Sequence, residues 1–310
     1  MPMKPILWIL ACGALWARWT LGAQPPTPAQ AFRTNDIVAL LGGGSAETRA
    51  HGAHWETLLT AAHPGHHLRL LNFAHAGDTV FSQLRDVNYP TPLQQVAQAK
   101  ATVCILDFGQ SEAYGGLERL DAFGERLEQW VLESQAIGTR VFLVTPIPVI
   151  REGAPPVEAY ARRIREIAHR RNLPVIDVFE AARSQKAPAV DGRTLTESAM
   201  ARVAALALRP WMHGLVSPQT DDAGRFTDAS WEALRQAHLE RNALWKGYTR
   251  PTNWAFLAGD RTEQPSSRDH RDLKIRWFPA EMEQFVPLLH AADRKTDALA
   301  QRLNPTENTR

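Results

Sequence analysis

The sequence predicts a three-layer α/β/α domain with a five-stranded parallel sheet, followed by a mostly helical C-terminal extension. Between about residues 36 and 212, short apolar runs alternate with segments of helical periodicity. The runs are rich in Val, Ile and Leu and lack polar alternation, which is typical of strands buried on both faces. From about residue 216 this alternation stops, and the chain becomes rich in Trp, Arg and Asn.

The expected strands are the five apolar runs at 36–41, 68–73, 102–108, 140–144 and 174–178. Turn formers follow several of them: Gly42 after the first, Gly109 after the third and Pro146 after the fourth. In open parallel sheets the chemistry lies in the loops at the carboxyl ends of the strands. Those loops are expected at 42–51, 74–80, 109–116, 145–156 and 183–195.

The helical patterns of the sheet domain lie at 55–62, 92–100, 117–137, 155–172 and from about 196 to 208. Gly138 is expected to end the third of these helices. The extension is expected to hold helices at 227–246 and 279–303. The resulting organisation is a linker at 24–35, a sheet domain at 36–215, a helical extension at 216–303 and a disordered tail at 304–310.

The N-terminus has the composition of a secretory signal peptide over residues 1–23. Lys4 precedes an apolar stretch at 5–17, and Leu21-Gly22-Ala23 is a small-residue ending of the kind that signal peptidase cuts. We therefore expect an exported, periplasmic or extracellular protein with no transmembrane segment after signal removal. A short membrane anchor and lipid attachment at Cys12 are alternatives, the second disfavoured by Leu10 two residues before the cysteine.

Composition and charge exclude some classes of function. The 310 residues carry 35 Lys and Arg against 33 Asp and Glu, a formal charge of +2, which argues against a nucleic-acid binder. Removal of residues 1–23 leaves Cys104 as the lone cysteine, so no internal disulfide can form. Cys104 lies in a buried-strand pattern and is expected to be a small core residue rather than a nucleophile.

Four of the expected loops carry a recognisable series of motifs. They are Gly42-Gly43-Gly44-Ser45, 72–78 (Asn-Phe-Ala-His-Ala-Gly-Asp), 108–113 (Phe-Gly-Gln-Ser-Glu-Ala) and 191–197 (Asp-Gly-Arg-Thr-Leu-Thr-Glu). In order and spacing over about 36–210, they resemble the four blocks of the SGNH/GDSL hydrolases, in particular a divergent exported branch with a C-terminal extension. The resemblance implies the flavodoxin-like SGNH fold and an ester hydrolase with a Ser–His–Asp site.

Carried over position by position, the resemblance implies a degenerate active site. Asp191 fits the triad Asp, but Thr194 stands at the His position, and threonine cannot serve as a base near neutral pH. Gly77 fits the oxyanion Gly loop, and Ser111 replaces the oxyanion Asn. The nucleophile position is Ser45 if Gly43 aligns with the family glycine, and Gly44 if Gly42 does.

Three ionisable residues near the expected site have more than one interpretation. His75, two residues before Gly77, is the best substitute base, or it is a partly exposed loop histidine. Asp78 with Thr79 is also a helix N-cap pattern. Glu112 could bind a polar substrate or pair with an arginine.

Six of the eleven histidines lie between residues 51 and 75. They follow no HExxH pattern; they are expected to be polar surface residues, with no metal and no cofactor. The tryptophans of the extension suggest either sugar stacking or anchoring against the sheet domain.

The function predicted is an exported ester hydrolase of weak activity that acts on a small-molecule ester or an acylated glycan. The alternative is a noncatalytic protein on the same fold that binds a carbohydrate, an acyl ester or a cell-envelope partner.

Overall fold

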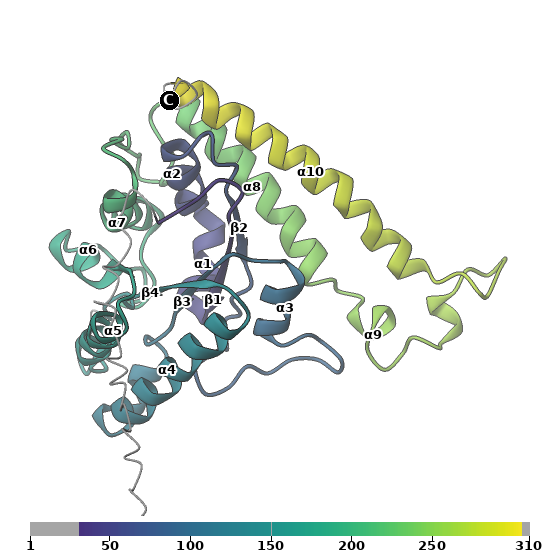
Figure 1. Ribbon diagram of the computed structural model, residues 1–310, viewed down its shortest axis with the longest axis horizontal. Coiled ribbons are helices and arrows are strands. Elements are labelled where there is room, and N and C mark those ends of the chain that lie inside the picture. Colours follow the sequence, from purple (N-terminus) through teal and green to yellow (C-terminus); the bar gives the residue numbers. More distant parts are fainter. Residues whose placement is uncertain (1–30, 150, 306–310) are drawn as a thin grey trace, which may run out of the picture.

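A five-stranded parallel sheet with strand order β2-β1-β3-β4-β5 lies at the centre of the computed structural model, which describes residues 31–149 and 151–305 (Figure 1). The strands are β1 (Ile37–Gly42), β2 (Arg69–Asn72), β3 (Val103–Asp107), β4 (Arg140–Val144) and β5 (Val175–Ile176). All five predicted strands are confirmed. The register pairs Leu40 with Asn72 and Gly42 with Asp107, so the first three strands end side by side. The predicted signal peptide lies outside the described residues.

Helices cover both faces of the sheet and confirm the three-layer architecture. One face packs against α1 (Gly44–Gly52), α2 (His54–Ala62), α6 (Val178–Ser184) and α7 (Glu197–Leu208), and the other against α3 (Pro92–Gln98), α4 (Leu120–Ala136) and α5 (Val157–Arg171). Successive β3 residues alternate between the two apolar cores: Val103 and Ile105 face one, Cys104 and Leu106 the other. The 3₁₀ turns are η2 (Glu112–Gly115), η3 (Leu117–Arg119), η4 (Arg209–Trp211) and η5 (Pro265–Ser267).

Two helices, α1 and α6, occupy segments where the sequence does not predict a helix. α1 occupies most of the segment expected as a glycine-rich loop, and the buried residues on it are only Ala46 and Gly52, so no apolar periodicity marks it. α6 begins at the end of the fifth predicted strand because the Asp177 side chain accepts a hydrogen bond from the Glu180 backbone N–H and caps the helix.

The extension consists of α8 (Ala229–Thr249), the short α9 (Trp254–Leu257) and α10 (Trp277–Leu303). The helices α8 and α10 pack along each other, and both contact α2 (Figure 1). From α8, Arg241 and Trp245 donate hydrogen bonds to the carbonyls of Leu70 and Asn72. The extension thereby covers the outer edge of β2, which would otherwise present unpaired backbone groups.

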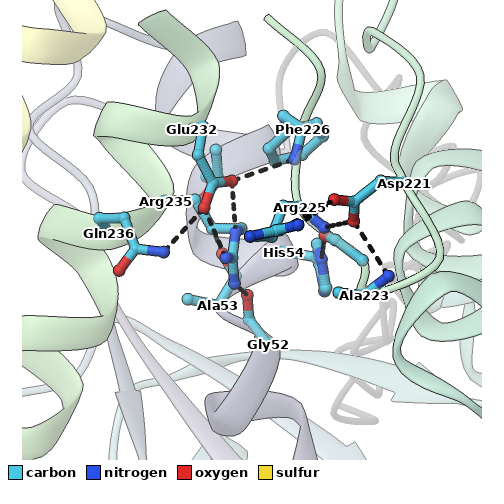
Figure 2. Close-up of polar contacts among 12 residues, drawn as sticks. Gly52, Ala53, His54, Asp221, Ala223, Arg225, Phe226, Glu232, Arg235 and Gln236 are labelled. Carbon is cyan, nitrogen blue, oxygen red and sulfur yellow. Dashed lines mark hydrogen bonds and ion pairs between the residues drawn. The ribbon is translucent and has the colours of Figure 1, made fainter. Parts of the chain in front are cut away.

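A buried polar clasp also holds the extension against the sheet domain (Figure 2). The ring Nε2 of His54 lies 2.8 Å from the carbonyl oxygen of Gly224, and Arg235 donates to the carbonyl of Gly52 over 3.1 Å. Glu232 holds Arg235 in place through an ion pair of 2.6 Å. Nearby, Trp231 is buried in the same apolar core as the strands, which confirms an anchoring role for this tryptophan.

The expectation that the clustered histidines are polar surface residues is wrong for two of them. His54 and His63 are buried, and the ring Nε2 of each faces a backbone carbonyl, that of Gly224 and that of Trp211. Their segment forms α2 and the turn after it, which are pressed between the sheet and the extension. Burial lowers the pKa of His54, and it lowers the pKa of His63 to about 3.

Cys104 is buried in β3, as predicted for a core residue, and burial raises the pKa of its thiol to about 12. In the portion of the chain that the structure covers, no helix combines the length and the apolar character needed to cross a bilayer.

We expect Arg235→Ala to lower the free energy of unfolding by about 1–3 kcal/mol, because it leaves the Gly52 carbonyl and the Glu232 carboxylate without their buried partner. Urea unfolding measures the change. Arg225→Ala is the matched control, since Arg225 pairs with Asp221 at the exposed side of the same clasp. Equal effects of the two substitutions would contradict the clasp.

The buried His238 of α8 gives a second expectation, a dependence of stability on pH. Burial, with smaller contributions from Arg241 and Arg69, lowers its pKa to about 3 from an ordinary 6.5. Between these values the unfolded chain binds more protons than the folded one, so stability falls as pH falls, by up to about 1.4 kcal/mol per pH unit.

We expect His238→Leu to reduce the dependence of the unfolding free energy on pH by up to about 1.4 kcal/mol per pH unit, which is the contribution of one proton. Thr60, which lies 2.9 Å from the ring Nε2, keeps a hydrogen bond to the carbonyl of Glu56. The exposed His290→Leu should leave the slope unchanged. Urea unfolding from about pH 7 to about pH 5 tests this, and indistinguishable slopes for the two variants would refute it.

Candidate active site

The turn between β1 and α1 is in close contact with the end of β3 and with the loop after β2. A Cβ atom at Gly42 would lie 2.2 Å from the carbonyl oxygen of Asp107, and one at Gly43 would lie 2.6 Å from that of Asp78. Glycine is therefore required at both positions. Gly44, the first residue of α1, has room for a side chain, because its nearest neighbour would be the Ala76 carbonyl oxygen at 3.6 Å.

The hydroxyl of Ser45 points to a buried carboxylate on the neighbouring strand. Ser45 Oγ donates to Asp107 Oδ1 over 3.4 Å, while Arg49 Nε donates to Asp107 Oδ2 over 2.7 Å. Burial raises the pKa of Asp107, and the adjacent Arg49 guanidinium opposes that rise. Sequence reasoning missed both partners, although an acid at the end of a fully apolar strand was an available signal.

Ser45 and Thr194 line the same small cavity of about 140 Å³. The walls come from α1, from Ala76 in the loop after β2 and from Gln110 in the loop after β3. Gln110 Nε2 donates to the carbonyls of Ile147 and Arg193, both at 3.1 Å, and so links three loops. Sequence reasoning did not single out Gln110.

The Asp191–Thr194 turn is organised by its own carboxylate. Asp191 Oδ1 accepts from the backbone N–H of Thr194 at 2.6 Å and of Arg193 at 2.9 Å, and the Thr194 hydroxyl donates to Oδ2 at 3.3 Å. These hydrogen bonds lower the pKa of Asp191. Asp191 is itself exposed, and it lies outside the set of residues that line the cavity.

Glu112 joins two loops through backbone N–H groups, and within the described residues it forms no ion pair with an arginine. Its two carboxylate oxygens accept hydrogen bonds from the backbone N–H groups of Val80 and Gly109, each at 2.7 Å. Burial raises its pKa, although these hydrogen bonds oppose the rise. The neighbouring Ser111 is exposed, with its Oγ 3.7 Å from the place that a Cβ at Gly43 would take.

The loop after β2 carries three candidate residues, Gly77, Asp78 and His75, and each lies in a different environment. Gly77 is exposed, with nothing near the position of a Cβ. Asp78 is buried and bound through both oxygens to Arg85, at 2.7 Å each. The N-cap interpretation of Asp78 is wrong, because no helix begins in the described segment 79–91 and the carboxylate is committed to Arg85.

The ring of His75 lines a second, larger cavity and not the cavity of Ser45. Its Nε2 is buried and has no hydrogen-bond partner within the described chain. Burial, then Arg250 and Arg85, lower the pKa of His75 to about 3, so the ring is neutral near pH 7. Across the described residues, no three His, Cys, Asp or Glu side chains are grouped as a metal ion would need.

Comparison with known proteins identifies the family. The sequence pattern of the GDSL-like lipase/acylhydrolase family matches residues 35–196, more than half of the chain. The chain belongs to that family. No curated protein matches it.

Two solved structures illustrate the similarity. LAE5, an alpha/beta hydrolase enzyme from the metagenome of Lake Arreo, is 16% identical with a TM-score of 0.48, over 59% of this chain and 98% of its own. Axe2, an acetylxylan esterase from Geobacillus stearothermophilus, is 17% identical with a TM-score of 0.47, over 58% and 95%.

We expect Glu112→Gln to destabilise the fold by about 1–3 kcal/mol, because the amide NH₂ would face one of the two backbone N–H groups as a second donor. Thermal and urea unfolding measure the loss. The exposed Glu118→Gln, six residues further along, should be neutral within about 0.5 kcal/mol. If Glu112→Gln left the free energy of unfolding unchanged, the two loops would not depend on the hydrogen bonds that Glu112 accepts.

Proposed function

We propose that the protein is an exported ester hydrolase of slow turnover, with a degenerate Ser–His–Asp site and Ser45 as its nucleophile. One observation carries the proposal: Ser45 and Thr194, the last residue of the Asp191–Thr194 turn, line a single cavity. Export rests on the composition of residues 1–23. The substrate would be a short-chain carboxylic ester or an acylated glycan.

The size of the cavity favours a short acyl group. Its volume is about 140 Å³, whereas one water molecule occupies roughly 30 Å³ in the liquid. The cavity therefore has room for a small acyl group but not for a long acyl chain. Ser45 Oγ would attack the acyl carbon and release the alcohol, and water would then hydrolyse the acyl-enzyme. By resemblance, Gly77 and Ser111 would contribute oxyanion donors.

Slow turnover follows from the proton that Ser45 must lose. In the described chain no histidine lines the cavity, and Thr194 cannot accept a proton near neutral pH. Asp107 accepts the Ser45 hydrogen bond only over 3.4 Å, longer than the roughly 2.6–3.2 Å of an efficient general base, and Arg49 binds its other oxygen. His75 is not assigned the role of base, because its ring lines the other cavity.

We expect the wild-type protein to hydrolyse 4-nitrophenyl acetate at least about a hundredfold more slowly than a family member with an intact triad, since a general base contributes roughly 10²–10⁴ in rate. Ser45→Ala should abolish the activity, and Thr194→His should raise it, because Asp191 already contacts residue 194. The matched controls are Ser266→Ala and Thr227→His, both exposed and away from the cavity. The proposal would be refuted if the wild-type protein hydrolysed the ester rapidly and the Ser45→Ala variant kept that activity.

A second candidate function is ligand binding without hydrolysis, favoured by the geometry at Gly44. A side chain there would face Ala76, beside the Gly loop, whereas Ser45 turns to Asp107. If Gly44 holds the nucleophile position, Thr194→His alone should stay inactive. The double variant Gly44→Ser, Thr194→His should then gain activity that persists when Ser45→Ala is added.

A further inference from the structure

We propose that the larger cavity, between the loop after β2 and the extension, is a binding site for a neutral saccharide. It is separate from the cavity of Ser45, and no step of ester hydrolysis needs it. Its volume is about 540 Å³, within the range of roughly 300–1,000 Å³ typical of small-molecule sites.

The walls of this cavity are fixed by contacts between segments far apart in the sequence. Trp254 Nε1 donates to the carbonyl of Val87 at 2.8 Å, and Asn88 donates to the carbonyl of Ala258 at 3.0 Å. The Tyr89 hydroxyl donates to the carbonyl of Thr249 at 2.5 Å. In Figure 1, α9 lies out beside the loop that leads to α3, in agreement with these contacts.

Three aromatic rings meet at the cavity. The centroid of the Tyr89 ring lies 4.7 Å from that of Trp254, with an interplanar angle of 62°, and 6.1 Å from that of His75, at 80°. All three side chains are half-buried. Edge-to-face packing holds the rings at fixed angles. Because these residues are only half-buried, part of their surface remains available to the apolar C–H faces of a sugar ring.

Two carboxylates at the cavity can accept hydrogen bonds from a ligand. Asp86 and Asp260 are exposed there, and neither side chain has a hydrogen bond or ion pair to another described residue. An ionised carboxylate can only accept hydrogen bonds.

The charges around the cavity favour a neutral ligand. Charges of both signs line the cavity, and an anion would face Asp86 and Asp260. A cation would face Arg250, which together with burial keeps the His75 ring neutral. Uncharged hydroxyl groups satisfy the carboxylates without either repulsion.

The two cavities are neighbours in the fold. His75 lines the larger one and Ala76 the smaller. Arg250 lines the larger one and pairs with Glu47, which lines the smaller. A saccharide bound beside Tyr89 therefore lies next to the ester site, although its binding does not depend on an ester bond.

Calorimetric titration of the purified full chain with tetrasaccharides that carry no ester group tests the site. The panel consists of β-1,4-linked xylose, glucose, mannose and N-acetylglucosamine. We expect one site per chain for at least one sugar. Trp254→Ala and Asp260→Asn should each weaken binding at least about tenfold. The matched controls are Trp277→Ala and Asp222→Asn, which change the same residue types outside the cavity.

Three results would overturn the proposal: no binding of any panel member, equal binding by both cavity variants, or saturable binding of tetramethylammonium at this site. Asp260→Asn removes only a charge, so it keeps the test valid if Trp254→Ala, which loses the bond to Val87, does not fold. Hydrolysis of 4-nitrophenyl acetate by these variants should equal that of wild type, so failure here and failure of the esterase proposal give different results.

Discussion

The buried ion pair between Arg49 and Asp107 is the interaction on which the candidate active site depends. It joins the first helix to the end of the central strand, at a place where that helix has few apolar contacts of its own. Breaking such a pair would leave a charge stranded in the interior, which is far more costly than losing an exposed ion pair. The position of Ser45, one turn before Arg49 on the same helix, follows from it.

The two glycines that precede this helix also help to position it against the rest of the site. Gly42 and Gly43 let the backbone approach the carbonyls of Asp107 and Asp78. Glu112 then ties the loop after β2 to the loop after β3 through two backbone N–H groups. The site is consequently assembled by backbone contacts and buried charges, and only secondarily by the side chains that would carry out chemistry.

This explains which parts of the molecule were predictable from the sequence. The five strands were predictable because burial on both faces selects unbroken runs of Val, Ile and Leu, and Thr196 marked the start of α7 because it is a local cap. The helix α1 was not predictable from apolar periodicity, since long-range polar bonds such as that of Arg49 hold it. The burial of His54 and the commitments of Gln110 and Glu112 depend likewise on partners distant in the chain.

The clasp at Gly52 and the cover over β2 bear on how the chain divides into folding units. Trp231, Leu234 and Ala300 belong to the same apolar core as the strands, so the core is completed only when the last helices dock. A fragment cut near residue 215 would expose that core together with the edge of β2. The family domain and its extension should therefore unfold in a single cooperative transition, and in this chain the boundary between them is one of sequence similarity rather than of stability.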